Sequence, residues 1–313
     1  MKKILSTLVL ISMLLFTLAS CGLRTDIRVG VMSGPTGMGM AKLMNDSGDN
    51  SNYTFSLYST PEEATADLVN GDIDMLCLPT NVAANLYNKN GKIKVLAINT
   101  LGSLFLLTSP NVTVNSVKDL SGKTIYASVP TSTTGPIINY ILSQNNVEAN
   151  VEFVADHQAL AAKVIKGEVD YAVLPEPIVT NALTKNANYK VALNLTTEWQ
   201  NVSSEPIVMG CIVVREEFFN NNKNAVLRFL DKYEDSIDFI EDIANHDKSA
   251  QMILDQKIVP AFKEISQVKR ALTNLYGSIE FIDDEDMVRA LKSFYTAIGQ
   301  AQPDNSFYYV EKD

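Results

Sequence analysis

The residues of this chain that could do chemistry lie in four short loops, each placed after a predicted strand. Glycine and hydroxyl side chains are frequent in these loops, and none of the loops contains Arg or Lys. Free N–H groups at helix starts attract anionic or electron-rich groups, and glycines allow a ligand close to the backbone. We therefore predict ligand recognition here, by the following residues: Ser33, Gly34, Thr36, Gly37, Thr80, Asn81, Thr131, Ser132, Thr133, Thr134 and Glu176.

Each of these residues also has a purely structural explanation. A plain strand-to-helix turn explains the glycines of residues 33–37 equally well. Residues 131–135 carry more hydroxyls than helix capping needs, so the surplus favours recognition. Glu176 is expected either to pair with a ligand amine or ring nitrogen, or to cap a helix towards solvent. Trp199, the only tryptophan, either stacks on a ligand ring as a further site residue or packs inside a lobe.

An internal repeat predicts how the four loops are positioned. The segment 71–79, Gly-Asp-Ile-Asp-Met-Leu-Cys-Leu-Pro, returns 96 residues later as Gly-Glu-Val-Asp-Tyr-Ala-Val-Leu-Pro at 167–175. This period is too long for a solenoid unit of ~20–50 residues and has the size of a small lobe. Two similar lobes predict a ligand between them. The repeated Asp74 and Asp170 each follow a glycine turn, far from the loops, and are expected to stabilise that turn.

Short β-branched runs alternate with helical patterns, which predicts an α/β fold with mostly parallel sheets. Ligands of open α/β sheets bind outside the carboxyl ends of the strands, where the four loops begin. The apolar runs at 103–108 and 206–214 are predicted as crossovers between the lobes. Apolar stripes at helical spacing after residue 223 predict helices that pack on the lobes.

The N-terminus indicates export. Lys2 and Lys3 precede an apolar stretch from 5 to 18, and Leu18-Ala19-Ser20-Cys21 follows. The stretch is shorter than the ~20 residues of a spanning helix and is typical of a signal peptide. Cys21 after Leu-Ala-Ser resembles the bacterial lipobox, which implies removal of residues 1–20 and lipidation of Cys21. The alternative is an ordinary signal peptide followed by a chance cysteine.

Charge and cysteine content limit the classes of function. The net charge of −10 opposes nucleic-acid binding, which requires Lys and Arg against phosphates. Neither histidine belongs to a motif and no Cys/His cluster has metal spacing, so we expect no catalytic residue, no metal and no cofactor. Cys77 and Cys211 lie in apolar runs; they either pair, if adjacent in space, or remain buried free thiols.

Together the motifs resemble ABC-transporter solute-binding proteins of the nitrate/sulfonate/taurine type, which include thiamine-precursor binders. The likeness rests on Asp119-Leu120-Ser121-Gly122-Lys123, the repeated Gly-(Asp/Glu)-x-Asp segments, Leu174-Pro175-Glu176-Pro177, the helical pattern 223–244 and the sequence 303–309. It implies a type II periplasmic-binding fold: two Rossmann-like lobes joined by two crossover strands, with C-terminal helices. The expected parts are the signal peptide 1–20, a lipidated tether 21–26, lobe 1 over 27–108, lobe 2 over 109–206, and the return crossover with C-terminal helices, packed mainly on lobe 1, over 207–313.

The resemblance also implies a function. It predicts a monomeric, lipid-anchored receptor on the extracytoplasmic face of the cell membrane, which closes on a small molecule and delivers it to an ABC permease and ATPase. The neutral loops slightly favour a pyrimidine- or vitamin-like ligand over a sulfonate or nitrate. A sensory or adhesive lipoprotein with the same cleft is an alternative. An enzyme of this fold is another, although the His/Cys-rich site of pyrimidine synthases and the cofactor-bearing Cys of porphobilinogen deaminases have no counterpart in the sequence.

Overall fold

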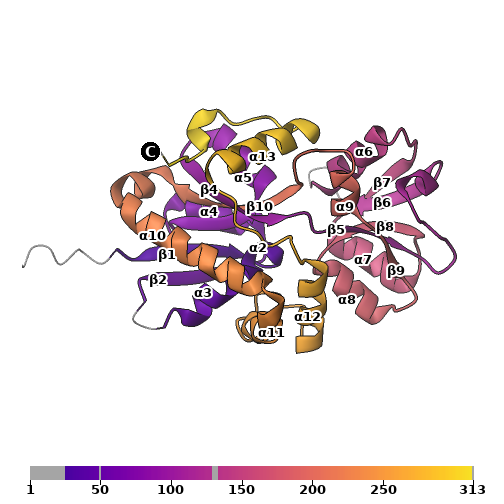
Figure 1. The fold of residues 1–313 in the computed structure, drawn as a ribbon, viewed down its shortest axis with the longest axis horizontal. Helices are drawn as coiled ribbons and strands as arrows, with labels where there is room; N and C mark the ends of the chain where they lie inside the picture. The colour runs from indigo at the N-terminus through magenta and orange to yellow at the C-terminus, as the bar shows by residue number, and fades with distance from the viewer. Residues whose placement is uncertain (1–24, 49–50, 129–132, 312–313) are drawn as a thin grey trace, which may run out of the picture.

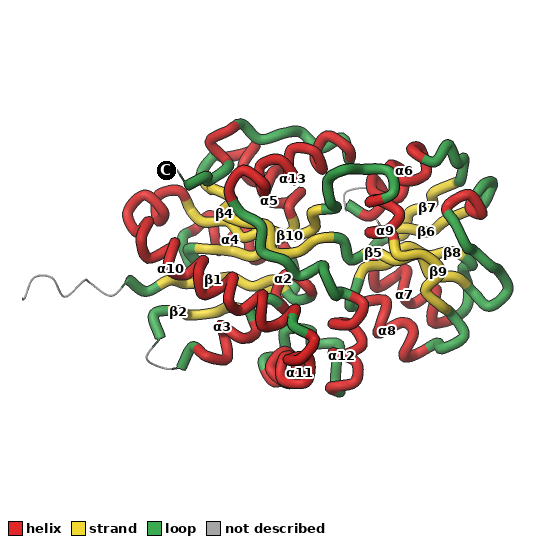
Figure 2. The backbone as a smooth tube through the Cα atoms, viewed as in Figure 1, coloured by secondary structure: helices red, strands yellow, loops and turns green. Residues whose placement is uncertain are grey.

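The computed structural model describes residues 25–48, 51–128 and 133–311 of the chain. Figures 1 and 2 show two lobes side by side, each built on one sheet with helices on both faces. The predicted α/β class and the division into two lobes are therefore confirmed. Cys21 and the predicted signal peptide lie outside the described residues. Within the described ranges, no helix combines the length and apolar character needed to cross a membrane.

The first lobe contains a five-stranded sheet in the order β2-β1-β3-β10-β4. β1, β2 and β3 are parallel, and β10 is antiparallel to both of its neighbours. The strands are β1 Ile27–Met32, β2 Tyr53–Tyr58, β3 Met75–Pro79, β4 Ile93–Leu101 and β10 Val208–Arg215, and the helices α2 Pro35–Met38, α3 Ala41–Asp46, α4 Pro61–Asn70 and α5 Thr80–Asn90.

The second lobe repeats this plan in the order β7-β6-β8-β5-β9. Its strands are β5 Leu104–Thr108, β6 Thr124–Ser128, β7 Asn150–Val154, β8 Tyr171–Pro175 and β9 Lys190–Asn194. Its helices are η1 Val117–Leu120, α6 Thr134–Gln144, α7 His157–Lys166, α8 Ile178–Lys185 and α9 Leu195–Gln200. The inserted antiparallel strand is β5 here and β10 in the first lobe; in sequence, β5 directly follows the strand β4 of the first lobe, and β10 follows α9 of the second lobe.

The predicted end of lobe 1 at residue 108 is wrong. β5 pairs antiparallel with β8 and with β9, so it belongs to the second sheet. The first crossover is therefore short and lies at Gly102 and Ser103, between β4 and β5. Once the chain has left the first sheet, its buried N–H and C=O groups need hydrogen-bond partners in the second sheet. All of β5 therefore pairs within lobe 2.

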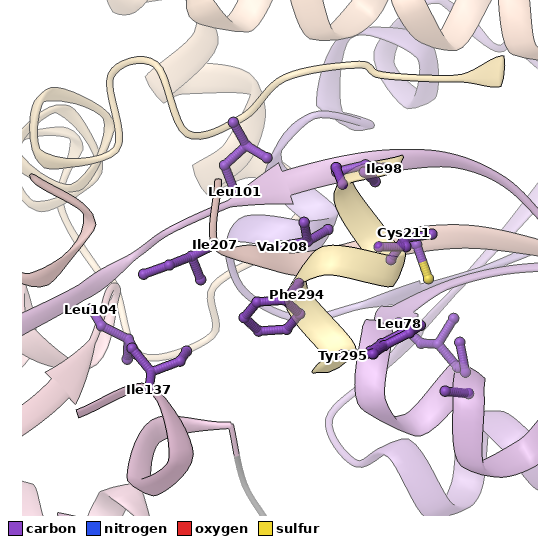
Figure 3. Packing of buried hydrophobic residues seen from close by; sticks show 14 of the residues in the cluster. Leu78, Ile98, Leu101, Leu104, Ile137, Ile207, Val208, Cys211, Phe294 and Tyr295 are labelled. Atoms are coloured by element: carbon purple, nitrogen blue, oxygen red, sulfur yellow. The ribbon is translucent and has the colours of Figure 1, made fainter. Parts of the chain in front are cut away.

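The C-terminal part comprises α10 Glu216–Glu241, η2 Ile243–Asn245, α11 His246–Asp255, α12 Ile265–Asn274, α13 Asp284–Ala297 and η3 Asn305–Phe307. α10 contacts β10, β4 and α3 of the first lobe, whereas α12 also contacts α8 of the second lobe. One buried apolar cluster continues through both crossovers. In Figure 3, Leu101 and Ile207 of the crossover regions lie near Leu104 and Ile137 of the second lobe and Phe294 of α13.

Cys77 and Cys211 are both buried free thiols. They sit on adjacent antiparallel strands, where Cys77 is opposite Ile212 and Cys211 is opposite Leu78. Successive side chains of a strand point to opposite faces of the sheet. Cys77 accordingly packs in one core cluster and Cys211 in another. The sheet separates the two thiols, so of the two predicted alternatives the buried free thiols are confirmed.

We therefore expect no bond between Cys77 and Cys211 even in protein purified without reductant. Burial raises the pKa of the Cys77 thiol to about 12, which keeps it protonated and unreactive in the native state. Alkylation with peptide mapping should find both cysteines unmodified in native protein and both modified after unfolding without reductant. Resistance of both cysteines to alkylation after unfolding, reversed by a reductant, would contradict this prediction.

Candidate functional site

The loops predicted from the two lobes face each other in the structure. The Thr133 hydroxyl, at the start of α6 in lobe 2, lies 3.6 Å from the sulfur of Met209 in β10 of lobe 1. A Cβ atom on Gly34, after β1, would lie 3.9 Å from Cδ of Pro177, after β8. Thr133 and Gly34 each follow the carboxyl end of a parallel strand and lie against the other lobe. A ligand held between the sheets would meet these loops.

In the first loop, the two glycines serve the fold in different ways. Gly34 has φ +110°, a conformation that L side chains rarely adopt. A Cβ on Gly37 would lie 2.4 Å from the carbonyl oxygen of Met32, because α2 turns back directly over the end of β1. Gly37 is thus required by local packing, while Gly34 is required by its positive φ and brings the backbone up to Pro177 of lobe 2. Ser33, half-buried, anchors the loop by donating its N–H to the Tyr58 carbonyl over 2.8 Å.

Thr36 belongs to a polar cluster that the sequence analysis did not recognise. A Cβ on Gly210 would lie 2.9 Å from Oγ1 of Thr36, 2.6 Å from Oδ1 of Asn99 and 3.0 Å from Oγ1 of Thr100. The Thr100 hydroxyl donates to Asn99 Oδ1 over 3.1 Å. Asn99 and Thr100 are buried at the carboxyl end of β4. The sequence contains one signal for this cluster. The polar residues Asn99 and Thr100 come near the end of the largely apolar strand β4, and Gly210 interrupts the apolar strand β10.

Thr80 is held by the fold and is not free to contact a ligand. Its side chain is buried, and its hydroxyl donates to the Val208 carbonyl over 2.7 Å. Its own carbonyl accepts a hydrogen bond from the Tyr295 hydroxyl over 2.9 Å. The prediction for Thr80 is therefore corrected: it joins α5 to β10 and α13. Asn81, the next residue, is half-buried in the first turn of α5.

The hydroxyl-rich loop of lobe 2 is described only in part. Thr131 and Ser132 lie outside the described residues. The Thr133 hydroxyl caps no N–H group of α6 and instead contacts Met209 of lobe 1. Thr134, buried, is the first residue of α6. Thr133 is thus one of the hydroxyls that helix capping does not use, and it is directed across to the other lobe.

Glu176 is buried, and the alternative of a cap facing solvent is wrong. Only 1% of the surface of Glu176 is exposed. Its carboxylate accepts hydrogen bonds from the Thr180 N–H over 3.2 Å, from the Thr180 hydroxyl over 2.9 Å and from Asn274 Nδ2 over 2.5 Å. Burial raises the pKa of the Glu176 carboxyl, and these hydrogen bonds oppose the rise. In this arrangement the carboxylate is satisfied by the protein, so pairing with a ligand amine would require these bonds to break.

Trp199 is corrected from a ligand-stacking residue to a core residue, which was its packing alternative. It is 1% exposed, with its ring centroid 4.4 Å from that of Tyr140 in α6 and 5.8 Å from that of Phe294 in α13. Its indole N–H donates to the Glu205 carbonyl over 2.8 Å. Both the ring and the N–H are used within the protein. Trp199 joins the second lobe to the C-terminal helices.

A hydroxyl and an imidazole meet at the carboxyl ends of β6 and β7. Ser128 Oγ lies 3.5 Å from Nε2 of His157, the first residue of α7. Burial lowers the pKa of His157, although Asp156 opposes this effect, so the ring is neutral near pH 7. No sequence motif indicates this pair, because Ser128 lies 29 residues before His157 and belongs to another strand. This pair is the one arrangement in the described site that suggests acid–base chemistry.

The chain is similar to known proteins over most of its length. The model of a family described as menaquinone biosynthesis matches residues 38–300. No curated protein sequence matches the chain. An ABC transporter structure from Parabacteroides distasonis is 19% identical, with a TM-score of 0.74 over 92% of this chain and 100% of its own.

Two further solved structures carry ligand names. The aliphatic sulphonate binding protein SsuA of Escherichia coli is 14% identical, with a TM-score of 0.68 over 89% of this chain and 94% of its own. The nitrate-binding protein NrtA of Synechocystis PCC 6803 is 13% identical, with a TM-score of 0.59 over 84% and 74% of the two chains. These neighbours confirm the resemblance to binding proteins of ABC transporters and share the type II periplasmic-binding fold.

Proposed function

The chain belongs to the menaquinone biosynthesis family, and within that family we propose that it is a solute-binding receptor of an ABC importer. The observation that carries the proposal is the apposition of the strand ends, with Thr133 against Met209 and Gly34 against Pro177. Binding proteins close on ligand by rotation of two lobes about the crossovers. A ligand that touches both lobes favours closure through contacts that the open form lacks.

The side chains at the facing loops favour an uncharged or zwitterionic ligand. Thr36 and Thr133 offer hydroxyl groups, and none of the four predicted loops contains Lys or Arg. Such groups recognise ring nitrogens, carbonyls and hydroxyls by hydrogen bonding. We propose a pyrimidine- or vitamin-like compound, with alkanesulfonates and nitrate as less favoured ligands.

We further propose that the receptor is a monomer anchored by lipidated Cys21 on the extracytoplasmic face of the membrane. The support is the sequence Leu18-Ala19-Ser20-Cys21 after a short apolar stretch. Copurification with a permease and an ATPase would support the transport role. Stable ligand binding without such partners would instead favour a sensory or adhesive lipoprotein.

A ligand panel tests the binding proposal. We expect one compound among thiamine, its pyrimidine precursors, riboflavin, taurine, alkanesulfonates and nitrate to raise the unfolding temperature. A ligand at 100 times its Kd stabilises the native state by about 2.7 kcal/mol. Thr36→Val should weaken the shift by removing the hydroxyl at nearly constant volume. Thr65→Val is the matched control, since the Thr65 hydroxyl bonds only within α4 in the described contacts. Equal shifts for both variants would contradict the placement of Thr36 in the site.

An enzyme is the second candidate, because the family description names a biosynthetic route and because Ser128 and His157 form a potential acid–base pair. A neutral His157 could accept a proton from a bound compound. In that case incubation with aromatic carboxylate precursors of naphthoquinones should yield a product of changed mass. His157→Asn should then abolish turnover while leaving the thermal shift. Recovery of every compound unchanged would favour the receptor.

A further inference from the structure

The last residue of α12 and the coil that leads from it to α13, residues 274–283, form a strap across the first crossover. Figure 1 shows this coil running along the middle of the molecule between the two helices. Its Ser278 hydroxyl donates to the Gly102 carbonyl over 2.6 Å, and its Ser278 carbonyl accepts the Leu101 N–H over 2.7 Å. Ile282 and Ile98 exchange two backbone hydrogen bonds of 2.7 and 3.1 Å. The strap therefore extends the edge of β4 up to the point where the chain leaves lobe 1.

The strap is fixed to the first lobe from a second side. Glu241, the last residue of α10, accepts the N–H groups of Gly277 and Ile279, each over 2.8 Å. α10 itself packs on β10 and β4. The strap is thus tied to lobe 1 through both a helix and a sheet edge, so it should move with that lobe.

At its first residue the strap reaches the second lobe. Asn274 Nδ2 donates to Glu176 Oε1 over 2.5 Å, and Glu176 directly follows β8. The other two bonds to the Glu176 carboxylate come from Thr180 of the same lobe. Arg270, one turn before Asn274 on α12, adds favourable electrostatic interaction. Of the three hydrogen bonds to Glu176, the one from Asn274 therefore links the second lobe to the strap.

We infer that the Asn274–Glu176 hydrogen bond is a latch that holds the two lobes together, and that its rupture accompanies opening. This inference rests on the proposed receptor function, since it describes how access to that ligand site is controlled. A hydrogen bond to a buried carboxyl group contributes enough free energy to change a two-state equilibrium by about tenfold. Removing Asn274 leaves Glu176 with its Thr180 bonds but without a bond to the strap.

The test measures lobe separation without any ligand. Spin labels on Glu62→Cys in α4 and Lys166→Cys in α7 report one exposed site on each lobe. We expect electron-spin distance measurements on the full chain to show more molecules with long separations in Asn274→Ala than in the wild type. The ratio of open to closed molecules should rise by about tenfold. Thr273→Ala is the matched control on the same helix, because its hydroxyl bonds only to Lys269 in the described contacts. It should keep the wild-type distribution.

Wild-type distances in Asn274→Ala, with unchanged circular dichroism, would overturn the latch. If Asn274→Ala perturbs folding, Asn274→Leu retains a side chain of similar size but cannot donate a hydrogen bond to Glu176; it should also open the lobes. Failure of every ligand in the panel, together with opening of both variants, would leave the latch standing and count against the receptor. If a ligand binds but the distances are unchanged in both variants, the receptor function is supported and the latch is overturned.

Discussion

Replacing Trp199 by alanine is expected to lower the free energy of unfolding by about 3–5 kcal/mol, the usual cost of deleting a buried tryptophan. The side chain is enclosed by Tyr140 and Phe294, which come from different parts of the fold. Deletion therefore leaves a cavity where lobe 2 meets α13. It also leaves the Glu205 carbonyl without its indole donor.

Chemical denaturation followed by circular dichroism measures this loss. Trp199→Phe should recover part of the stability, since it refills most of the volume but cannot donate to Glu205. Tyr276→Ala is the control, because Tyr276 is 61% exposed and its loss should change stability by less than about 0.5 kcal/mol. Near-wild-type stability of Trp199→Ala, with ligand affinity lost instead, would restore the ligand-stacking role.

The second large effect concerns Asp74, which sits before β3 at the amino end of the first sheet. It is 1% exposed and bonds to Arg28 of β1 and to Arg215 of β10, with each guanidinium 2.7 Å from Oδ1. Removing one partner of a buried ion cluster leaves the others unpaired, typically at 3–5 kcal/mol. Both arginines are partly exposed, so we expect Asp74→Asn to cost about 3 kcal/mol, near the lower end of that range.

The pH dependence of this effect has a definite sign. Burial would raise the pKa of Asp74, but hydrogen bonds from Arg28 and Arg215 outweigh it and hold the pKa below the ordinary value of 3.8. A lowered pKa in the folded state means that the stabilisation is present above pH 4 and is lost as the pH falls through the folded-state pKa. The difference between wild type and Asp74→Asn should therefore shrink in acid.

The repeat supplies the control for Asp74. Asp170 occupies the same position in the second copy, but it is exposed and its side chain pairs with the Ser109 hydroxyl. Asp170→Asn should cost less than about 1 kcal/mol. Equal losses for Asp74→Asn and Asp170→Asn would show that the glycine turn, which both copies share, determines the effect, and would contradict the role of the arginine cluster.

The fold was predictable where the signals are local or repeated. The alternation of strands and helices and the constant offset between residues 71–79 and 167–175 indicated two α/β lobes. The position of β5 was not predictable from its apolar sequence, because a strand buried on both faces reads alike in either sheet. Its partners, β8 and β9, are set by where the crossover places the chain.

The site was predictable in outline only. The carboxyl-end rule predicted the loops of Gly34 and Thr133, and in the structure both loops lie against the opposite lobe. It could not reveal that Glu176 is buried, since its partner Asn274 lies 98 residues away in the sequence. It likewise missed Asn99, because the convergence of β4 and β10 on one polar cluster depends on pairing between distant segments.

We propose that the lobes close on a small molecule and release it unchanged. Native mass spectrometry of the protein, mixed with the small-molecule fraction of its host cells, tests this most directly. We predict one low-mass adduct per chain, which denaturation releases as a compound already present in the extract. A chain that stays free of any adduct, or a bound compound whose mass differs from every compound in the extract, would contradict the receptor.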